Sequence, residues 1–250
     1  NVRIYSTKVG VRIASTEGPE KTIIMGARDE TSPDGCGTNA TLLIAITSNT
    51  GLSGFTLTGG YSPANGSARR PIYSYGVDLT VSDCIITNNH GRHYAVGTAT
   101  FERCLIKDNY GADYVLVGSR LYSCIVEGNH LTNPDAIILG DMNASIWANY
   151  NFNCTLIGDG IHNMWDQKNA ASRRINTIVD NGGPIALANG INAGNIYNGF
   201  AVYEPTISDM IADPMLCDGY KVFSKSPALY AAANPADDAS CPWWYLCQTD

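Results

Sequence analysis

The chain has 250 residues, of which 44% are hydrophobic and 16% are charged, and its formal net charge is −7. This length and hydrophobic content suffice for one elongated domain with a filled core. The negative charge argues against a nucleic acid or an anionic membrane as partner, and no apolar run approaches the roughly 20 residues of a membrane span.

The chain starts at Asn1 rather than at an initiator methionine, and its first residues, NVRIYS, already have the character of a strand. We therefore expect a targeting segment upstream of Asn1. Such a segment predicts an extracellular or cell-surface location for the protein.

A repeat with a period of twenty residues dominates the middle of the chain. Three similar phrases, CIITNNHG, CLIKDNYG and CIVEGNHL, begin at Cys84, Cys104 and Cys124. If insertions near 60–74 and 131–150 are allowed, the cysteine position also includes Gly54, Cys154 and Asn176. A repeat of this length indicates one supersecondary unit that stacks on the next.

Each repeat contains three short aliphatic or β-branched runs. In two successive repeats they are Leu79–Val81, Cys84–Ile86 and Tyr94–Val96, then Ala99–Phe101, Cys104–Ile106 and Tyr114–Val117. No two-residue hairpin turn joins them, and no window keeps a helical period, so each run must pair with its equivalent in the next repeat. The sequence predicts an all-β fold, a right-handed parallel β-helix of about 7–8 coils with three short strands per coil.

Equivalent side chains of stacked coils should form ladders about 4.8 Å apart. The predicted inward ladders are Val81, Phe101 and Leu121; Ile86, Ile106, Val126, Leu156 and Ile178; and four free thiols at Cys84, Cys104, Cys124 and Cys154. A further ladder contains Asn89, Asn109 and Asn129. We expect these asparagines to form the bend, because Asn tolerates left-handed backbone and its amide can bond to the Asn above. A row of sugar contacts is the alternative.

The other cysteines lie outside the repeat frame: Cys36, Cys217, Cys241 and Cys247. An oxidising compartment would allow a disulfide between Cys241 and Cys247. The chain has neither C-x-x-C spacing nor a Cys/His cluster, so we expect no metal site.

The β-helix is predicted to span residues 1–232, and residues 233–250 form a C-terminal tail with the phrase CPWWYLC. The aromatic residues of this tail either form an exposed platform for sugars or cap the open end of the solenoid. Capping, or packing against a following segment, is the preferred interpretation because every solenoid must cover its strand edges.

Four phrases carry a resemblance to a known family: GVRIASTEGPEKTIIMG, LSGFTLTGGYS, the serial cysteine phrases and IADPMLCDGYKVFSKSPALYAA. From Val11 to Ala232 the chain resembles bacterial extracellular right-handed β-helix repeat proteins of the pectate-lyase-like superfold. The resemblance implies a secreted or surface protein that binds extracellular polysaccharide, a surface glycan or another surface partner. The fold does not fix the chemistry. The alternative is a lyase or epimerase for a uronate-containing glycan, and only a lyase would imply a cofactor, Ca²⁺.

Lys107 and Glu127 are the candidates for a catalytic pair, because a lyase needs a base and a group that neutralises the uronate carboxylate. A stacked pair of opposite charges is also typical of any solvated parallel ladder. Arg173 and Arg174 could bind a uronate or sulfate bidentately, or form a solvated edge pair. Since no set of residues has lyase-specific spacing, a non-catalytic binding protein is the favoured interpretation.

The turn after the asparagine position carries His90, Tyr110 and His130 at equal steps, with His93 and Asp113 three residues further on. Rings on an exposed ridge suit stacking and hydrogen bonding to sugars. His90 and His130 should lie two coils apart, at about 9.6 Å, which approaches the repeat of a disaccharide. The alternative is that turns simply tolerate such residues.

Overall fold

A computed structural model of the chain describes residues 10–46, 49–63, 70–74, 78–140, 149–159, 161–165, 173–180, 191–193, 195–197 and 210–211. In these residues the structure has strands and no helix, and the strands stack in parallel sheets. The predicted all-β parallel β-helix is therefore confirmed. The predicted boundary at residue 232, the tail 233–250 and Cys217, Cys241 and Cys247 lie outside the described residues. No helix in the described part is long and apolar enough to cross a membrane.

Three long sheets run along the molecule. The first contains β1 (Val11–Ala14), β4 (Thr50–Ser53), β7 (Leu79–Ser82), β10 (Thr100–Glu102), β14 (Arg120–Tyr122), β18 (Tyr150–Phe152), β21 (Arg173–Ile175) and β23 (Ile191–Ala193). The second contains β2 (Ile23–Met25), β5 (Thr56–Thr58), β8 (Ile85–Thr87), β11 (Leu105–Lys107), β15 (Ile125–Glu127), β19 (Thr155–Ile157), β22 (Ile178–Asp180), β24 (Ile196–Tyr197) and β25 (Met210–Ile211).

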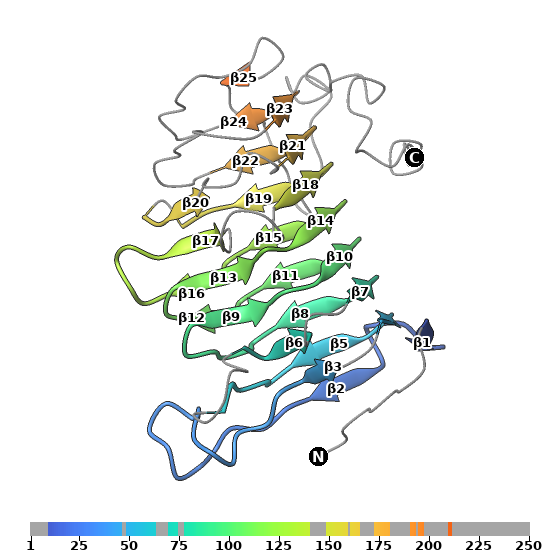
Figure 1. The fold of residues 1–250 in the computed structure, drawn as a ribbon, viewed down its shortest axis with the longest axis vertical. Helices are drawn as coiled ribbons and strands as arrows, with labels where there is room; N and C mark the ends of the chain where they lie inside the picture. Colours follow the sequence, from blue (N-terminus) through green and yellow to red (C-terminus); the bar gives the residue numbers. More distant parts are fainter. Residues whose placement is uncertain are drawn as a thin grey trace.

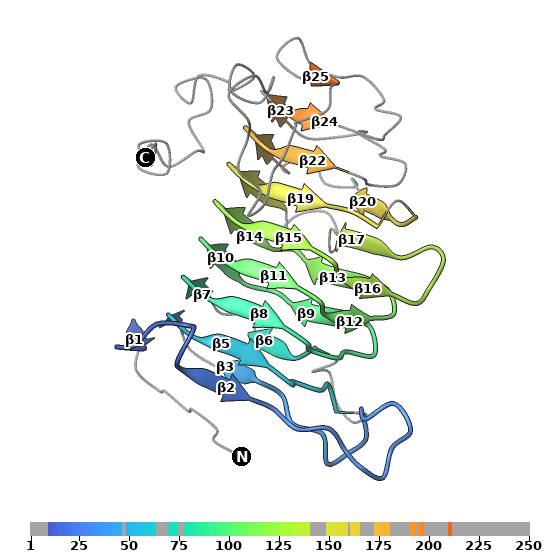
Figure 2. The same ribbon diagram turned by 180° about the vertical axis from the view of Figure 1, so that it is seen from behind.

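The third sheet contains β3 (Ile44–Ile46), β6 (Ile72–Ser74), β9 (Tyr94–Gly97), β13 (Tyr114–Val117), β17 (Ile137–Gly140) and β20 (Asn163–Trp165). A small fourth sheet pairs β12 (Tyr110–Gly111) with β16 (His130–Leu131) between the second and third sheets. The chain passes from the first sheet to the second and then to the third, and each circuit rises one rung in the right-handed sense (Figures 1 and 2).

The register between coils matches the twenty-residue period in the middle of the molecule, where Phe101 pairs with both Val81 and Leu121. Two predicted positions are wrong by one residue. Thr56 pairs with Ile85, so Phe55 rather than Gly54 takes the cysteine position. Ile178 pairs with Thr155, so the cysteine position passes from Asn176 to its neighbour Thr177, and Val179 is the inward residue.

Left-handed backbone explains both errors. Gly54 and Asn176 have φ angles of 78° and 52°, like Asp83 and Arg103, which directly precede cysteines. Residues that suit this conformation mark the turn and not the inward position after it. At these two coils the frame read from the sequence therefore differs by one residue from the register of the structure.

The cysteine position forms the expected ladder of buried free thiols: Cys84, Cys104, Cys124 and Cys154. Each thiol lies near backbone carbonyls; Cys104 Sγ is 3.3 Å from Val81 O and 3.4 Å from Glu102 O. Burial raises the pKa of Cys154 to about 12, so this thiol stays protonated at neutral pH. The Thr177 hydroxyl, in the same position, donates to two carbonyls in the same way.

Asn89, Asn109 and Asn129 form an interior ladder beneath the second bend. The Nδ2 of Asn89 donates to the Oδ1 of Asn109 at 2.9 Å, and Asn109 donates to Asn129 at the same distance. The left-handed residues are the preceding ones, Asn88 and Asp108 among them. The predicted hydrogen bonds between the asparagines are therefore confirmed, whereas the expected left-handed backbone is wrong for Asn89, Asn109 and Asn129, which lie one residue after it. Sugar contact by these side chains is excluded because they are almost completely buried.

Candidate functional site

Four aromatic rings stack on one another along the bend that follows the asparagine ladder. We call Tyr61, His90, Tyr110 and His130 the ring row. The ring centroids are 4.5 Å apart for Tyr61 and His90, 4.6 Å for His90 and Tyr110, and 4.7 Å for Tyr110 and His130. Backbone bridges join the same four positions, which keeps the rings in register with the coils.

The stacking changes what the ring row can offer to a ligand. The first two ring pairs are inclined by only 3° and the third by 21°, so the faces of the inner rings cover each other. The expected stacking of sugars on these faces is therefore blocked for His90 and Tyr110. Their edges remain, and Tyr110 is 39% exposed. Phenol and imidazole edges carry both donors and acceptors of hydrogen bonds.

A second row lies three residues further along each coil and contains His93, Asp113 and Asn133. His93 Nδ1 is 2.6 Å from Asp113 Oδ2, and Asn133 Nδ2 donates to Asp113 Oδ1 at 3.0 Å. Although burial alone would raise it, the hydrogen bonds from His93 and Asn133 hold the pKa of Asp113 below its ordinary value. The sequence predicted the positions of His93 and Asp113, and the same spacing leads to Asn133.

The loop between β2 and β3 closes the N-terminal end of the ring row. Gly35 lies against the Tyr61 ring, where an added Cβ would come within 2.7 Å of a ring carbon. Asp34 Oδ2 is 3.1 Å from Arg92 Nε, and the buried thiol of Cys36 lies 3.7 Å from His90 O. The loop is thus tied both to the bend of the third coil and to the ring row.

Asp29 organises this loop from within. Its carboxylate accepts hydrogen bonds from the hydroxyl and the amide of Thr31, at 2.6 and 2.9 Å, and from the amide of Asn39 at 3.0 Å. These bonds, that of the Thr31 hydroxyl foremost, lower the pKa of Asp29 to about 2. The loop therefore keeps its shape, and its place beside Tyr61, at any mildly acidic pH.

His90 makes the stability of the molecule depend on pH. Burial, and secondarily Arg28, lowers the pKa of His90 below its ordinary value. In the unfolded chain the His90 imidazole takes up a proton near pH 6.5, whereas in the folded chain it is still neutral at that pH. The free energy of unfolding should therefore fall as the pH decreases from about 7 to about 5. The change His90→Gln should flatten this slope in denaturation curves measured across the interval. Parallel curves for the two proteins would contradict the assignment.

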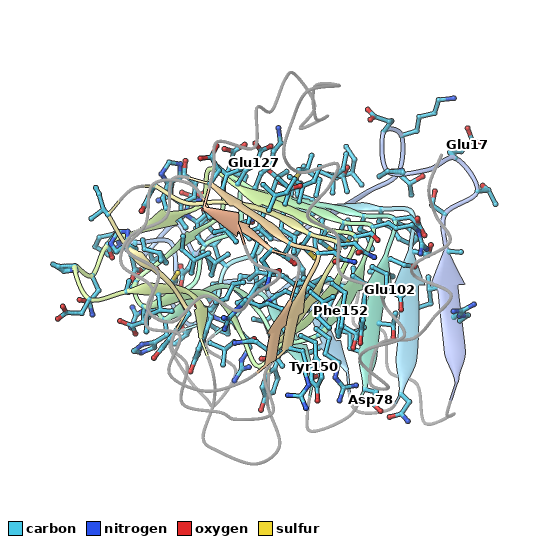
Figure 3. All side chains as sticks on the ribbon, turned by 90° about the horizontal axis from the view of Figure 1, so that it is seen from above. Glu17, Asp78, Glu102, Glu127, Tyr150 and Phe152 are labelled. Carbon is cyan, nitrogen blue, oxygen red and sulfur yellow. The ribbon has the colours of Figure 1, made fainter. Side chains whose placement is uncertain are left out.

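Lys107 and Glu127 are register neighbours on β11 and β15. Lys107 Nζ is 3.9 Å from Asp108 Oδ2, and the ion pairs of the described residues include none between Lys107 and Glu127. Burial raises the pKa of Glu127, and Lys107 opposes the change. Figure 3 shows Glu127 on the side of the molecule away from Glu102 and Phe152. A catalytic role for the pair stays a prediction.

Both interpretations of the arginines of β21, an anion clamp and a solvated edge pair, are wrong for Arg174. Arg173 is half-buried, whereas Arg174 is 2% exposed in the inward series of the first sheet, in register with Asn151. Successive residues of a strand point to opposite faces, so neighbouring arginines cannot grip the same external ligand. Arg174 is thereby excluded as a surface contact.

A shallow groove of about 230 Å³ crosses the first sheet over β1, β4, β7 and β10. Its lining includes Arg12, Ser53, Ser82 and the Arg103–Asp83 ion pair, whose two hydrogen bonds measure 2.7 and 2.8 Å. Arg103 lowers the pKa of Asp83 and satisfies its carboxylate.

No family model, curated protein or solved structure matches the chain. Among the described residues, no group of three or more His, Cys, Asp or Glu side chains could hold a metal ion. In the described part of the chain, the ring row with its neighbouring polar row is a regular arrangement of polar groups near the surface.

Proposed function

We propose that the protein is a non-catalytic binding protein that holds a polysaccharide chain along the ring row, outside the cell or at its surface. The observation that carries the proposal is the repetition of one ring per coil over four coils, at spacings of 4.5–4.7 Å. A straight, periodic row of polar groups is suited to a linear polymer, because successive repeat units can make equivalent contacts.

The neighbouring row supports the same proposal. His93, Asp113 and Asn133 stand beside the ring row on the same coils, so each coil of the third to fifth presents two polar side chains. Their hydrogen bonds to one another fix the side chains before a ligand arrives. Such preorganisation reduces the entropy that binding has to overcome.

The triple change His90→Ala, Tyr110→Ala and His130→Ala tests the proposal. It should weaken binding of the recognised polymer by at least about tenfold, equivalent to about 1.4 kcal/mol, because the polar edges of three coils are lost. Binding would be measured on a glycan array and then by titration calorimetry. Arg120→Ala, an exposed change on the first sheet, is the matched control and should bind normally. A folded triple variant with unchanged affinity would refute the ring row as the binding site.

A second candidate, cleavage or epimerisation of a uronate-containing glycan, is favoured by one observation. Asp113 holds the His93 imidazole at 2.6 Å, the arrangement that orients a general base. We nevertheless expect no unsaturated product from pectate, alginate or chondroitin sulfate, with or without Ca²⁺. A rise in ultraviolet absorbance that disappears in His93→Gln would establish an enzyme instead.

A further inference from the structure

We infer that the polymer on the ring row is a neutral, hydroxyl-rich polysaccharide and not a polyuronate or a sulfated glycan. The inference rests on the proposed function and names the chemical class of its ligand. It follows from the charges that surround the ring row, because the basic side chains there already lie beside carboxylates.

The basic side chains of the loop and bends beside the ring row already have carboxylate partners. Arg28 Nε is 3.4 Å from Glu30, Arg92 Nε is 3.1 Å from Asp34, and Lys107 Nζ is 3.9 Å from Asp108. The His93 imidazole has Asp113 at 2.6 Å in the same way. An incoming uronate or sulfate would have to displace one of these carboxylates.

Displacing a carboxylate from its ion pair would by itself cost little free energy, since exposed ion pairs contribute only about 0–1 kcal/mol. The displaced carboxylates cannot leave, however, because Asp34 and Asp113 are bound into the loop and the polar row. Glu127 adds another carboxyl group beside Lys107 and Asp108, and the whole chain carries a net charge of −7. A polyanion would therefore meet repulsion along its length.

A neutral sugar chain meets no such obstacle. Tyr110 offers a phenol, His90 and His130 offer imidazoles, and Asn133 offers an amide, and each of these groups can both donate and accept hydrogen bonds. Sugar hydroxyls are themselves both donors and acceptors. The rise of one coil, 4.5–4.7 Å between ring centroids, is similar to the advance of one sugar residue in an extended chain. Each coil would then serve one sugar residue.

The experiment uses polymer pairs that share one backbone and differ in charge. Mannan, xylan and mixed-linkage β-glucan are each compared with their carboxymethylated forms by affinity electrophoresis and calorimetry, with polygalacturonate and alginate as natural polyanions. Measurements are made at about 20 mM and about 500 mM salt, where screening differs strongly. We expect at least one neutral polymer to bind with an affinity that changes less than about twofold with salt, and its carboxymethylated form to bind roughly tenfold more weakly.

Asp34→Asn provides a gain-of-binding test. The amide oxygen can still accept the hydrogen bonds from the Ser32 hydroxyl and the Cys36 amide, while Arg92 loses its charged partner. This variant should acquire measurable, salt-sensitive affinity for polygalacturonate. Persistent absence of that affinity in a folded variant would show that ion pairing does not set the ligand class.

The outcomes separate the two proposals. Salt-insensitive binding of a neutral polymer that is lost in the triple ring variant supports both. Ring-dependent binding that prefers polyanions and weakens with salt overturns the neutral ligand and leaves the ring row as the binding site. If no polymer binds in a ring-dependent way, the proposed function itself is rejected.

Discussion

Replacement of Asn109 by alanine should lower the free energy of unfolding by about 3–5 kcal/mol, because several buried polar groups lose their partners at once. Asn109 Nδ2 lies 2.9–3.0 Å from the oxygens of Ile86, Lys107 and Asn129. Its Oδ1 accepts the backbone amide and the Nδ2 of Asn89, at 3.1 and 2.9 Å. Alanine can replace none of these contacts.

Urea denaturation measures this loss, and Asp108→Gly is the matched control. Asp108 is the exposed neighbour of Asn109 and has a φ angle of 53°, which glycine adopts without strain. The control should change stability by no more than about 1 kcal/mol. Equal midpoints for the two variants would mean that the asparagine ladder is not a principal source of stability.

Phe101→Ala should cost about 3–5 kcal/mol for a different reason, the cavity that it leaves in the core. Phe101 is completely buried in β10 and lies in register between Val81 and Leu121. Neighbouring coils are tied by backbone hydrogen bonds, so they cannot close in to fill the space. Thermal and chemical denaturation should both register the loss.

Two companion variants check this explanation. Thr100→Ala alters the adjacent, outward-facing residue of the same strand and should change stability by no more than about 0.5 kcal/mol. Phe101→Leu keeps most of the volume and should cost less than about half as much as alanine. If alanine and leucine proved equally harmful, the ring shape and not the cavity would be the cause.

The fold could be predicted because each coil of a solenoid repeats the same pattern of inward and turn residues, so the sequence itself is periodic. Cys84, Cys104 and Cys124 face the interior at equal steps, and each preserves a similar turn before and after it. Where the turn residues differ from those of the middle repeats, the predicted cysteine position is wrong by one residue. Gly54 has the left-handed backbone of Asp83 and Arg103 and therefore belongs to the turn, one residue before the cysteine position.

Because of this one-residue error, the sequence did not indicate Tyr61 as part of the candidate site. The ring position follows the cysteine position by six residues, so the frame built on Gly54 reaches Gly60, whereas the frame built on Phe55 reaches Tyr61. The stacking of the rings could not be read from the sequence, because it depends on side-chain rotamers and on how closely the bends superimpose. For the same reason the sequence predicted rings that present their faces, while the structure has rings that present their edges.

The ladders of the third, fourth and fifth coils have a consequence for the history of the protein. The upper surface of each of these coils matches the lower surface of the next, down to the amide of the buried asparagine and the carbonyl that receives the thiol. Duplication of one twenty-residue coil would therefore create no mismatched junction. The same event would add one ring to the ring row, so length and valency of binding could grow together in a single genetic step.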